Sequence, residues 1–317
     1  MTVKAIYKTS ETLGHLSKVR DYCDGNWVCL IAPTPEEVKD VSMYYGIELQ
    51  DLVSALDEDE RARVDADDDY TMIIIDVPYK DEEESKESYG TVPLAIILGD
   101  REKRYIITVC LRELQLLEDF RSGKIRKFFT YKKTRFILQI LYRNASYYLQ
   151  YLRMLERSIG GIEDELHRST RNEELFKLLS LDKSLVYLSN SLRANDLVLD
   201  RLMRLEAVKK YPEDQELLQD VIVENKQAIE MANVYSSILD VTMEAYSSVI
   251  SNNLNTVMKI LTSITFIMTI PTMIFSFFGM NVPLPWAENP AGTWLIGGLS
   301  LLSVGVAALF MKKRKLF

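Results

Sequence analysis

Cysteine and histidine are scarce in this chain, and their scarcity narrows the range of functions. Of the 317 residues, three are cysteines and two are histidines: Cys23, Cys29, Cys110, His15 and His167. Their spacing matches neither a disulfide framework nor a metal-binding motif, which suits a reducing compartment with small buried thiols. A nucleophile–base spacing and a phosphate-binding glycine loop are also missing, so we expect no enzyme and no organic cofactor.

A basic excess is missing as well. The formal net charge is −8, with 38 Lys and Arg against 46 Asp and Glu. A nucleic-acid partner is therefore not expected, because the sequence shows no basic face of the required size. The first residues, MTVKAIYKTSETLGHL, lack the apolar core of a signal peptide, so none is expected.

Long uncharged runs occur only near the C-terminal end. Ile260–Phe278 is uncharged for 19 residues and Trp294–Met311 for 18, and each is about long enough to cross a bilayer. A buried hairpin of a soluble core is the alternative. Four basic residues follow at 312–315, whereas the stretch 279–293 holds Glu288 and no Lys or Arg. The positive-inside tendency then predicts a multi-pass protein of the cell membrane, with both termini cytoplasmic and an outer loop.

The N-terminal residues 1–130 predict a cytoplasmic α/β domain, so that the whole is an α+β membrane protein. A helix is expected to begin at Thr34, because Pro35 and Glu37 complete an N-terminal capping pattern. The acidic stretches 57–69 and 80–88 are interpreted as loop or helix surface. Five segments rich in β-branched and aromatic residues are expected to be strands: 3–9, 26–32, 70–78, 92–99 and 104–110.

Residues 131–257 predict a helical cytoplasmic region. Helices at about 131–168 and 173–209 form an expected antiparallel pair. Neither glycine nor proline occurs from Glu213 to Ile270, so a stalk helix from about 213 should continue to Phe278, over about 100 Å. The full division is a stalk ending at 257, transmembrane helix 1 at 258–278, an outer loop at 279–293, transmembrane helix 2 at 294–311 and a basic tail at 312–317.

One stripe of the first apolar run is polar. Alternate steps of three and four select Asn255, Met258, Thr262, Thr265, Thr269, Thr272 and Ser276, and towards the N-terminus the stripe continues through Glu244 to Asp220. Such a stripe serves either helix–helix packing or a water-filled pore wall, and the pore wall is favoured. Two spans cannot enclose a pore, so several copies should surround one axis in a homo-oligomer.

Between the two runs lies Gly279-Met280-Asn281. A ring of Asn281 amides at the pore mouth would accept hydrogen bonds from the waters of a hydrated divalent cation. Neutral acceptors would hold the ion without trapping it. Gly279 would let the backbone turn where the helix ends.

With these features the chain resembles the CorA family of magnesium transporters over nearly its whole length. The stretch NNLNTVMKILTSIT (252–265) is similar to the family's inner pore segment, whereas Phe278 departs from the family's usual Tyr. The resemblance implies a funnel-shaped homopentamer in the lipid bilayer that conducts Mg²⁺, often with Co²⁺ and Ni²⁺. It also implies that Asn255, Met258, either Leu261 or Thr262, and Thr272 line the pore, with Met258 and Leu261 matching a hydrophobic gate.

The resemblance further implies gating by cytoplasmic Mg²⁺ bound between neighbouring subunits. Asp220 matches the family's aspartate on the stalk, but its counterpart on the α/β domain aligns near Ser54. Candidate ligands are therefore the nearby acids and those of the stalk: Asp51, Asp57, Glu58, Asp59, Asp220 and Glu244. A zinc transporter of a related branch is the alternative function, and Met280 at the centre of the motif argues against it.

Overall fold

The structure is a computed structural model. It describes residues 3–10, 15–67, 69–81, 88–99, 104–125, 127–166, 172–204, 211–280 and 290–313. The chain divides into two compact units, residues 1–242 and 243–317. The boundary between them falls inside one continuous helix, α7, which runs from Pro212 to Phe278.

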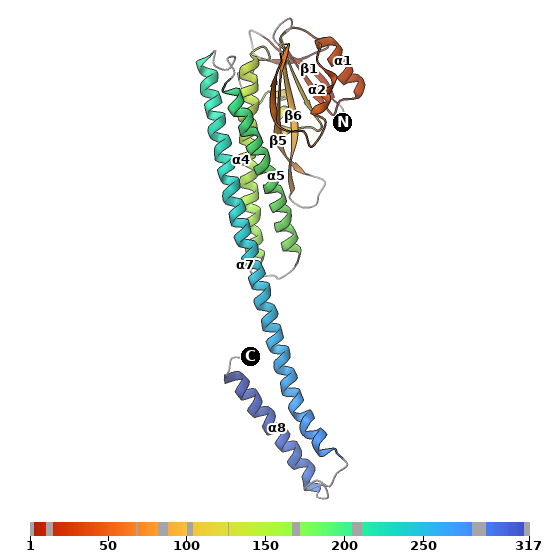
Figure 1. The fold of residues 1–317 in the computed structure, drawn as a ribbon, viewed down its shortest axis with the longest axis vertical. Helices are drawn as coiled ribbons and strands as arrows, with labels where there is room; N and C mark the ends of the chain where they lie inside the picture. The colour runs from red at the N-terminus through yellow and green to blue at the C-terminus, as the bar shows by residue number, and fades with distance from the viewer. Residues whose placement is uncertain are drawn as a thin grey trace. The chain divides into compact units, whose positions relative to one another are not determined.

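A seven-stranded sheet forms the centre of the first unit, in the order β2-β1-β3-β7-β6-β5-β4 (Figure 1). Strands β3 and β7 are parallel, and the other neighbours are antiparallel. The bounds are β1 Val3–Thr9, β2 Leu16–Val19, β3 Asn26–Ile31, β4 Arg63–Ala66, β5 Tyr70–Asp81, β6 Ser88–Gly99 and β7 Tyr105–Cys110.

All five predicted strands are confirmed, but β2 and β4 were not predicted. The interpretation of 57–69 as loop or helix surface is wrong for Arg63–Ala66, which pairs antiparallel with β5. This edge strand buries Val64 and carries Arg63 and Asp65 on its open side. Only one residue of this edge strand enters the core, so its composition resembles that of a solvent-exposed loop and gives little strand signal.

Helices cover both faces of the sheet, which explains why every residue of β3 and β7 is buried. Helices α1 (Pro35–Tyr45) and α2 (Leu49–Ser54) lie on one face through Val38, Val41 and Leu52. The Thr34–Glu37 capping box predicted for α1 is present. The other face packs around Trp27, whose ring meets Phe120 of α3 (Gln115–Arg121).

Three long helices complete the first unit. Helices α4 (Lys133–Leu166) and α5 (Asn172–Leu202) form the predicted pair, and the first part of α7 packs beside both (Figure 1). Tyr235 of α7 donates to Glu156 of α4 at 2.8 Å, and Arg193 of α5 donates to Asn233 of α7 at 3.0 Å. Polar contacts therefore fix the register of α7 against its two neighbours.

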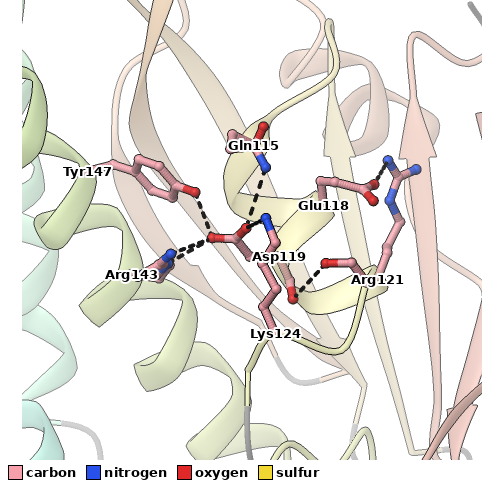
Figure 2. A network of polar contacts seen from close by, with 8 residues as sticks. Gln115, Glu118, Asp119, Arg121, Lys124, Arg143 and Tyr147 are labelled. Atoms are coloured by element: carbon pink, nitrogen blue, oxygen red, sulfur yellow. Dashed lines mark hydrogen bonds and ion pairs between the residues drawn. The ribbon is translucent and has the colours of Figure 1, made fainter.

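A buried carboxylate joins α3 to α4 (Figure 2). Asp119 is 1% exposed and accepts hydrogen bonds from Tyr147 at 2.6 Å, Arg143 at 2.7 and 2.9 Å, and Lys124 at 3.0 Å. Gln115 adds a longer contact of 3.4 Å. Since Arg143 and Tyr147 belong to α4, this one side chain anchors α4 to the α/β domain.

The second unit holds the rest of α7 and helix α8 (Pro290–Lys313). Two helices of the described residues, Pro212–Phe278 and Ala291–Lys313, contain stretches long and apolar enough to cross a membrane. The predicted spans 258–278 and 294–311 lie within them. Helix α7 continues through Pro271, which removes one helical hydrogen bond without ending the helix.

Candidate functional site

The polar stripe of α7 lies on an exposed face of the chain. All of its predicted members are exposed: Asn255, Met258, Leu261, Thr262, Thr265, Thr269, Thr272 and Ser276. Met258 and Leu261, the predicted gate, are 52% and 57% exposed. No described residue of the chain covers the stripe, so its side chains are available to solvent or to another copy.

A different face of α7 is the covered one. Ser263 is 2% exposed, and Ile267, Ile270, Ile274 and Phe278 are half-buried. Helix–helix packing is the alternative explanation of the polar stripe. Within the described residues of one chain the stripe is exposed, so packing of this kind would have to come from another copy.

The threonine hydroxyls share one orientation. Thr265 donates to the carbonyl of Leu261 at 2.9 Å, Thr269 to that of Thr265 at 2.8 Å, and Thr272 to that of Met268 at 2.9 Å. Each hydroxyl hydrogen is thus used by the helix itself. What remains for a partner is the oxygen lone pairs, so this face offers hydrogen-bond acceptors.

The same face is hollowed. A groove of about 550 Å³ is lined by Leu261, Thr262, Thr265, Phe266, Thr269, Ile270 and Met273. Acceptor oxygens in a mostly apolar groove suit a hydrated cation, because the waters of such an ion are hydrogen-bond donors.

Helix α7 ends as expected before the Gly-Met-Asn motif. The N–H of Gly279 donates to the carbonyl of Phe275 at 2.9 Å, and a Cβ on Gly279 would lie 3.1 Å from that oxygen. This close approach favours glycine. Met280 is 54% exposed. Asn281, the predicted centre of selectivity, lies outside the described residues, as do the rest of the loop to 289 and the tail from 314.

The predicted regulatory acids are not gathered in one chain. Asp220 and Glu244 are exposed on α7, in different units, whereas Asp57, Glu58 and Asp59 follow α2. Among the described residues, no group of three His, Cys, Asp or Glu side chains could hold a metal ion.

Several of the acids near Ser54 already have partners. Ser54 donates to the carbonyl of Asp51 at 2.8 Å, and the carboxylate of Asp51 accepts from Tyr70 at 2.5 Å. Glu58 pairs with Arg112 at 3.4 Å, and Asp57 accepts from the N–H of Asp59 at 3.1 Å. Of the acids 57–59, Asp57 and Asp59 are accordingly the two without a cationic partner in the described contacts.

Sequence reasoning overlooked two acids of the first unit, Asp76 and Asp119. Asp76 stands alone in the apolar run YTMIIIDVP, and Asp119 precedes Phe120 in an amphipathic helix. A lone charge inside an otherwise apolar strand was the available signal for Asp76. The sequence around Asp119 gave no such signal, because its partners on α4 approach it only through tertiary packing.

A sequence model of the CorA-like Mg²⁺ transporter protein family matches residues 24–313. The chain belongs to this family. It is 30% identical over 297 residues to the cobalt/magnesium transport protein CorA of Methanocaldococcus jannaschii, covering 90% of each chain.

Solved structures agree with this assignment. The complete structure of the CorA magnesium transporter from Methanocaldococcus jannaschii matches with a TM-score of 0.83 at 28% identity, over 98% of both chains. The cytoplasmic domain of ZntB from Vibrio parahaemolyticus matches with a TM-score of 0.59 at 11% identity, over 79% of this chain and 98% of that one. That second likeness concerns the fold alone. The predicted order of α/β domain, long helix and C-terminal apolar helix is confirmed.

Proposed function

We propose that this protein carries Mg²⁺ across the cell membrane as a homopentamer, with Co²⁺ and Ni²⁺ as further substrates. The N- and C-termini would be cytoplasmic and the loop 279–293 outside. Membership of the CorA-like family and the name of the cobalt/magnesium relative support the choice of ions. The alternative, zinc transport, has weaker support, because the ZntB likeness is one of fold.

The observation that carries this proposal is the row of hydrogen-bond acceptors that the threonine hydroxyls form along α7. Thr265, Thr269 and Thr272 direct their hydrogens into their own helix and leave lone pairs on an exposed face, and Thr265 and Thr269 also line the groove. Copies arranged with this face inward would line a path for hydrated cations and disfavour anions. Asn255 and Ser276 would extend the path, Met258 and Leu261 would narrow it, and Asn281 would select at its outer end.

Regulation by cytoplasmic Mg²⁺ is a further part of the proposal. Asp220 of one copy would meet Asp57 or Asp59 of a neighbour, and Glu244 would add charge along the stalk. The role of Glu58 would be smaller, since Arg112 already neutralises it. Bound Mg²⁺ would shift the equilibrium towards the closed arrangement by the difference between its affinities for the closed and open states.

Ion uptake into proteoliposomes tests the transport function. Replacing Asn281 by Ala removes the amides at the pore mouth, so Mg²⁺ uptake should fall at least about tenfold while the oligomer survives. Asn253→Ala is the matched control, because Asn253 is exposed on α7 but lies off the stripe. Mg²⁺, Co²⁺, Ni²⁺ and Zn²⁺ should be compared in parallel. Unchanged uptake by a well-folded Asn281→Ala protein would contradict the role of this residue, and uptake of Zn²⁺ alone would favour the alternative.

A further inference from the structure

Helix α5 is apolar on two opposite faces. Its inner face packs into the first unit through buried leucines: Leu181, Leu185, Leu188 and Leu192. Its outer face carries apolar side chains that are exposed: Leu179, Val186, Tyr187 and Leu197. A surface helix normally has one apolar face, and a helix that is apolar all round is buried. The outer face of α5 is therefore expected to be covered in the assembled protein.

Two exposed rows of the same spacing run along α5 and the first part of α7. The α5 row, followed against the direction of the chain, is Leu197, Asn190, Val186 and Leu179. The α7 row, followed along the chain, is Val223, Glu230, Val234 and Val241. Successive members are seven, four and seven residues apart in both rows. This is the heptad spacing of helices that pack along their length.

Contacts within one chain place the two rows at matching levels. Helices α5 and α7 lie side by side, and Asn225 of α7 donates to Asp196 of α5 at 3.3 Å (Figure 1). Leu197 therefore lies near the level of Val223. At the other ends of the rows, burial and then the charge of Asp240 raise the pKa of Asp182. The proximity of these two acids places Leu179 near the level of Val241.

The two rows do not cover each other within the described part of one chain, because both are exposed. Copies related by rotation about an axis along α7 keep every residue at its own level. The α5 row of one copy can thus meet the α7 row of the next copy, in the antiparallel sense, without a shift along the helix.

A cavity beside the α5 row points to the same neighbour. Leu197 lines this cavity of about 360 Å³ together with Asp59. On α7, Val223 follows Asp220 by three residues, or about one helical turn. The regulatory contact proposed above joins Asp220 of one copy to Asp57 or Asp59 of a neighbour. The same approach of the two copies brings Val223 to Leu197.

We propose that the α5 row of one copy packs against the α7 row of the next copy in antiparallel orientation. The opposed pairs are Leu197 with Val223, Asn190 with Glu230, Val186 with Val234 and Leu179 with Val241. Three pairs are apolar, and in the fourth the amide of Asn190 can donate to the carboxylate of Glu230. This inference rests on the cyclic assembly of copies in the proposed function, and it assigns a surface of that assembly.

The contact would couple neighbouring copies mechanically. Asn195 of α5 holds the edge of the sheet: its amide donates to the Asp76 carbonyl at 2.8 Å, and its oxygen accepts from the Asp76 N–H at 2.9 Å. Helix α5 is thereby fixed to its own α/β domain. Through the two rows it would connect this domain to the long helix of the next copy.

Paired cysteines in the full-length protein test the register. In a background where half-exposed Cys23 is replaced by Ser, one protein carries Leu179→Cys with Val241→Cys, and a second carries Leu197→Cys with Val223→Cys. Membranes that contain each protein are treated with a mild oxidant and analysed on a denaturing gel without reductant. Because each disulfide would join one copy to the next, both proteins should give a ladder of covalent oligomers.

Leu179→Cys with Val234→Cys is the matched control. Val234 belongs to the same row as Val241, but it lies seven residues, or about 10 Å, away along α7. A disulfide requires two Cα atoms within about 7 Å of each other. The control protein should therefore remain monomeric under the same oxidant.

Monomers from both matched pairs, unlinked or closed within one chain, would overturn the proposed contact. A ladder from the control as strong as those of the matched pairs would overturn its register. Covalent dimers from Leu179→Cys or Leu197→Cys alone would also reject it, because the same face of α5 would then meet itself.

Mg²⁺ uptake by the reduced proteins in liposomes separates this inference from the proposed function. Uptake without a ladder rejects the α5–α7 contact alone. A ladder without uptake supports the contact and counts against the transport function.

Discussion

At the scale of single residues, Asp119 and Asp76 show how the partners of a carboxyl that is fully or half buried decide its charge. Burial alone would raise the pKa of Asp119, but bonds from Tyr147, Arg143, Lys124 and Gln115 lower it to about 2. Burial raises the pKa of Asp76 to about 6, with no cation among its described contacts to lower it. Asp119 therefore stabilises the fold above pH 4 and loses this contribution as the pH falls towards 2. Because its pKa is raised in the folded state, Asp76 lowers the free energy of unfolding above pH 6, and this loss disappears below pH 4.

We expect Asp119→Asn to lower the free energy of unfolding by about 2 kcal/mol at pH 7, since a shift of nearly two pKa units is removed. The difference in free energy of unfolding between the variant and the wild type should shrink as the pH falls towards 3, because the stabilisation from ionised Asp119 is lost below the ordinary carboxyl pKa. Urea unfolding of the detergent-solubilised protein, followed by tryptophan fluorescence, measures both effects.

Asp65→Asn is the control for Asp119→Asn, because Asp65 pairs with Arg63 at an exposed edge strand. Exposed ion pairs contribute roughly 0–1 kcal/mol, so its effect should be smaller. Equal losses in the two variants would contradict the anchoring role of Asp119.

At the scale of elements, a helix or strand was predicted correctly where the residue pattern within the segment determines its structure. The apolar run NWVCLI predicted β3, and the Thr34–Glu37 pattern predicted the start of α1. The absence of glycine and proline predicted the length of α7. Strand β4 could not be predicted, because it is only four residues long, two of them charged, and its pairing with β5 is a tertiary contact. The same limit applies to Asn195, which completes the edge of β5 from a distant helix.

The capping box of α1 gives a prediction for one element. Thr34→Ala should destabilise the first unit by about 1 kcal/mol, because the N–H of Glu37 loses its acceptor. Thr34→Ser keeps the oxygen and should remain within a few tenths of a kcal/mol of the wild type. Thermal unfolding of the three proteins at one pH measures the difference, and a Ser variant as unstable as the Ala variant would argue against capping.

At the scale of the whole molecule, the described part of one chain leaves a long face of α7 exposed. The stripe from Asn255 to Ser276 was predicted from its spacing alone. Its residues are exposed and three of its threonines donate to their own helix, and its role as a pore wall stays a prediction. The arrangement of copies could not be derived in the same way, because the residues that would meet belong to different chains. The regulatory acids illustrate this, since no metal-binding group forms among the described residues of one chain.

Cross-linking between copies tests whether the stripe surrounds an axis. In a background where half-exposed Cys23 is replaced by Ser, Met258→Cys places a thiol at the predicted gate. If five copies converge there, mild oxidation should join neighbours, and a denaturing gel should show covalent dimers. Ile260→Cys is the matched control, because it lies two residues away on α7, is also exposed, and points off the stripe.

The two cysteine variants should therefore differ. Met258→Cys should yield disulfide-linked dimers efficiently, and Ile260→Cys should remain largely monomeric under the same oxidant. Reduced Met258→Cys protein should still take up Mg²⁺, and oxidation should block that uptake, because the linked side chains close the narrowest part of the path. Efficient cross-linking through Ile260→Cys with none through Met258→Cys would place the opposite face at the axis and reject the proposed pore wall.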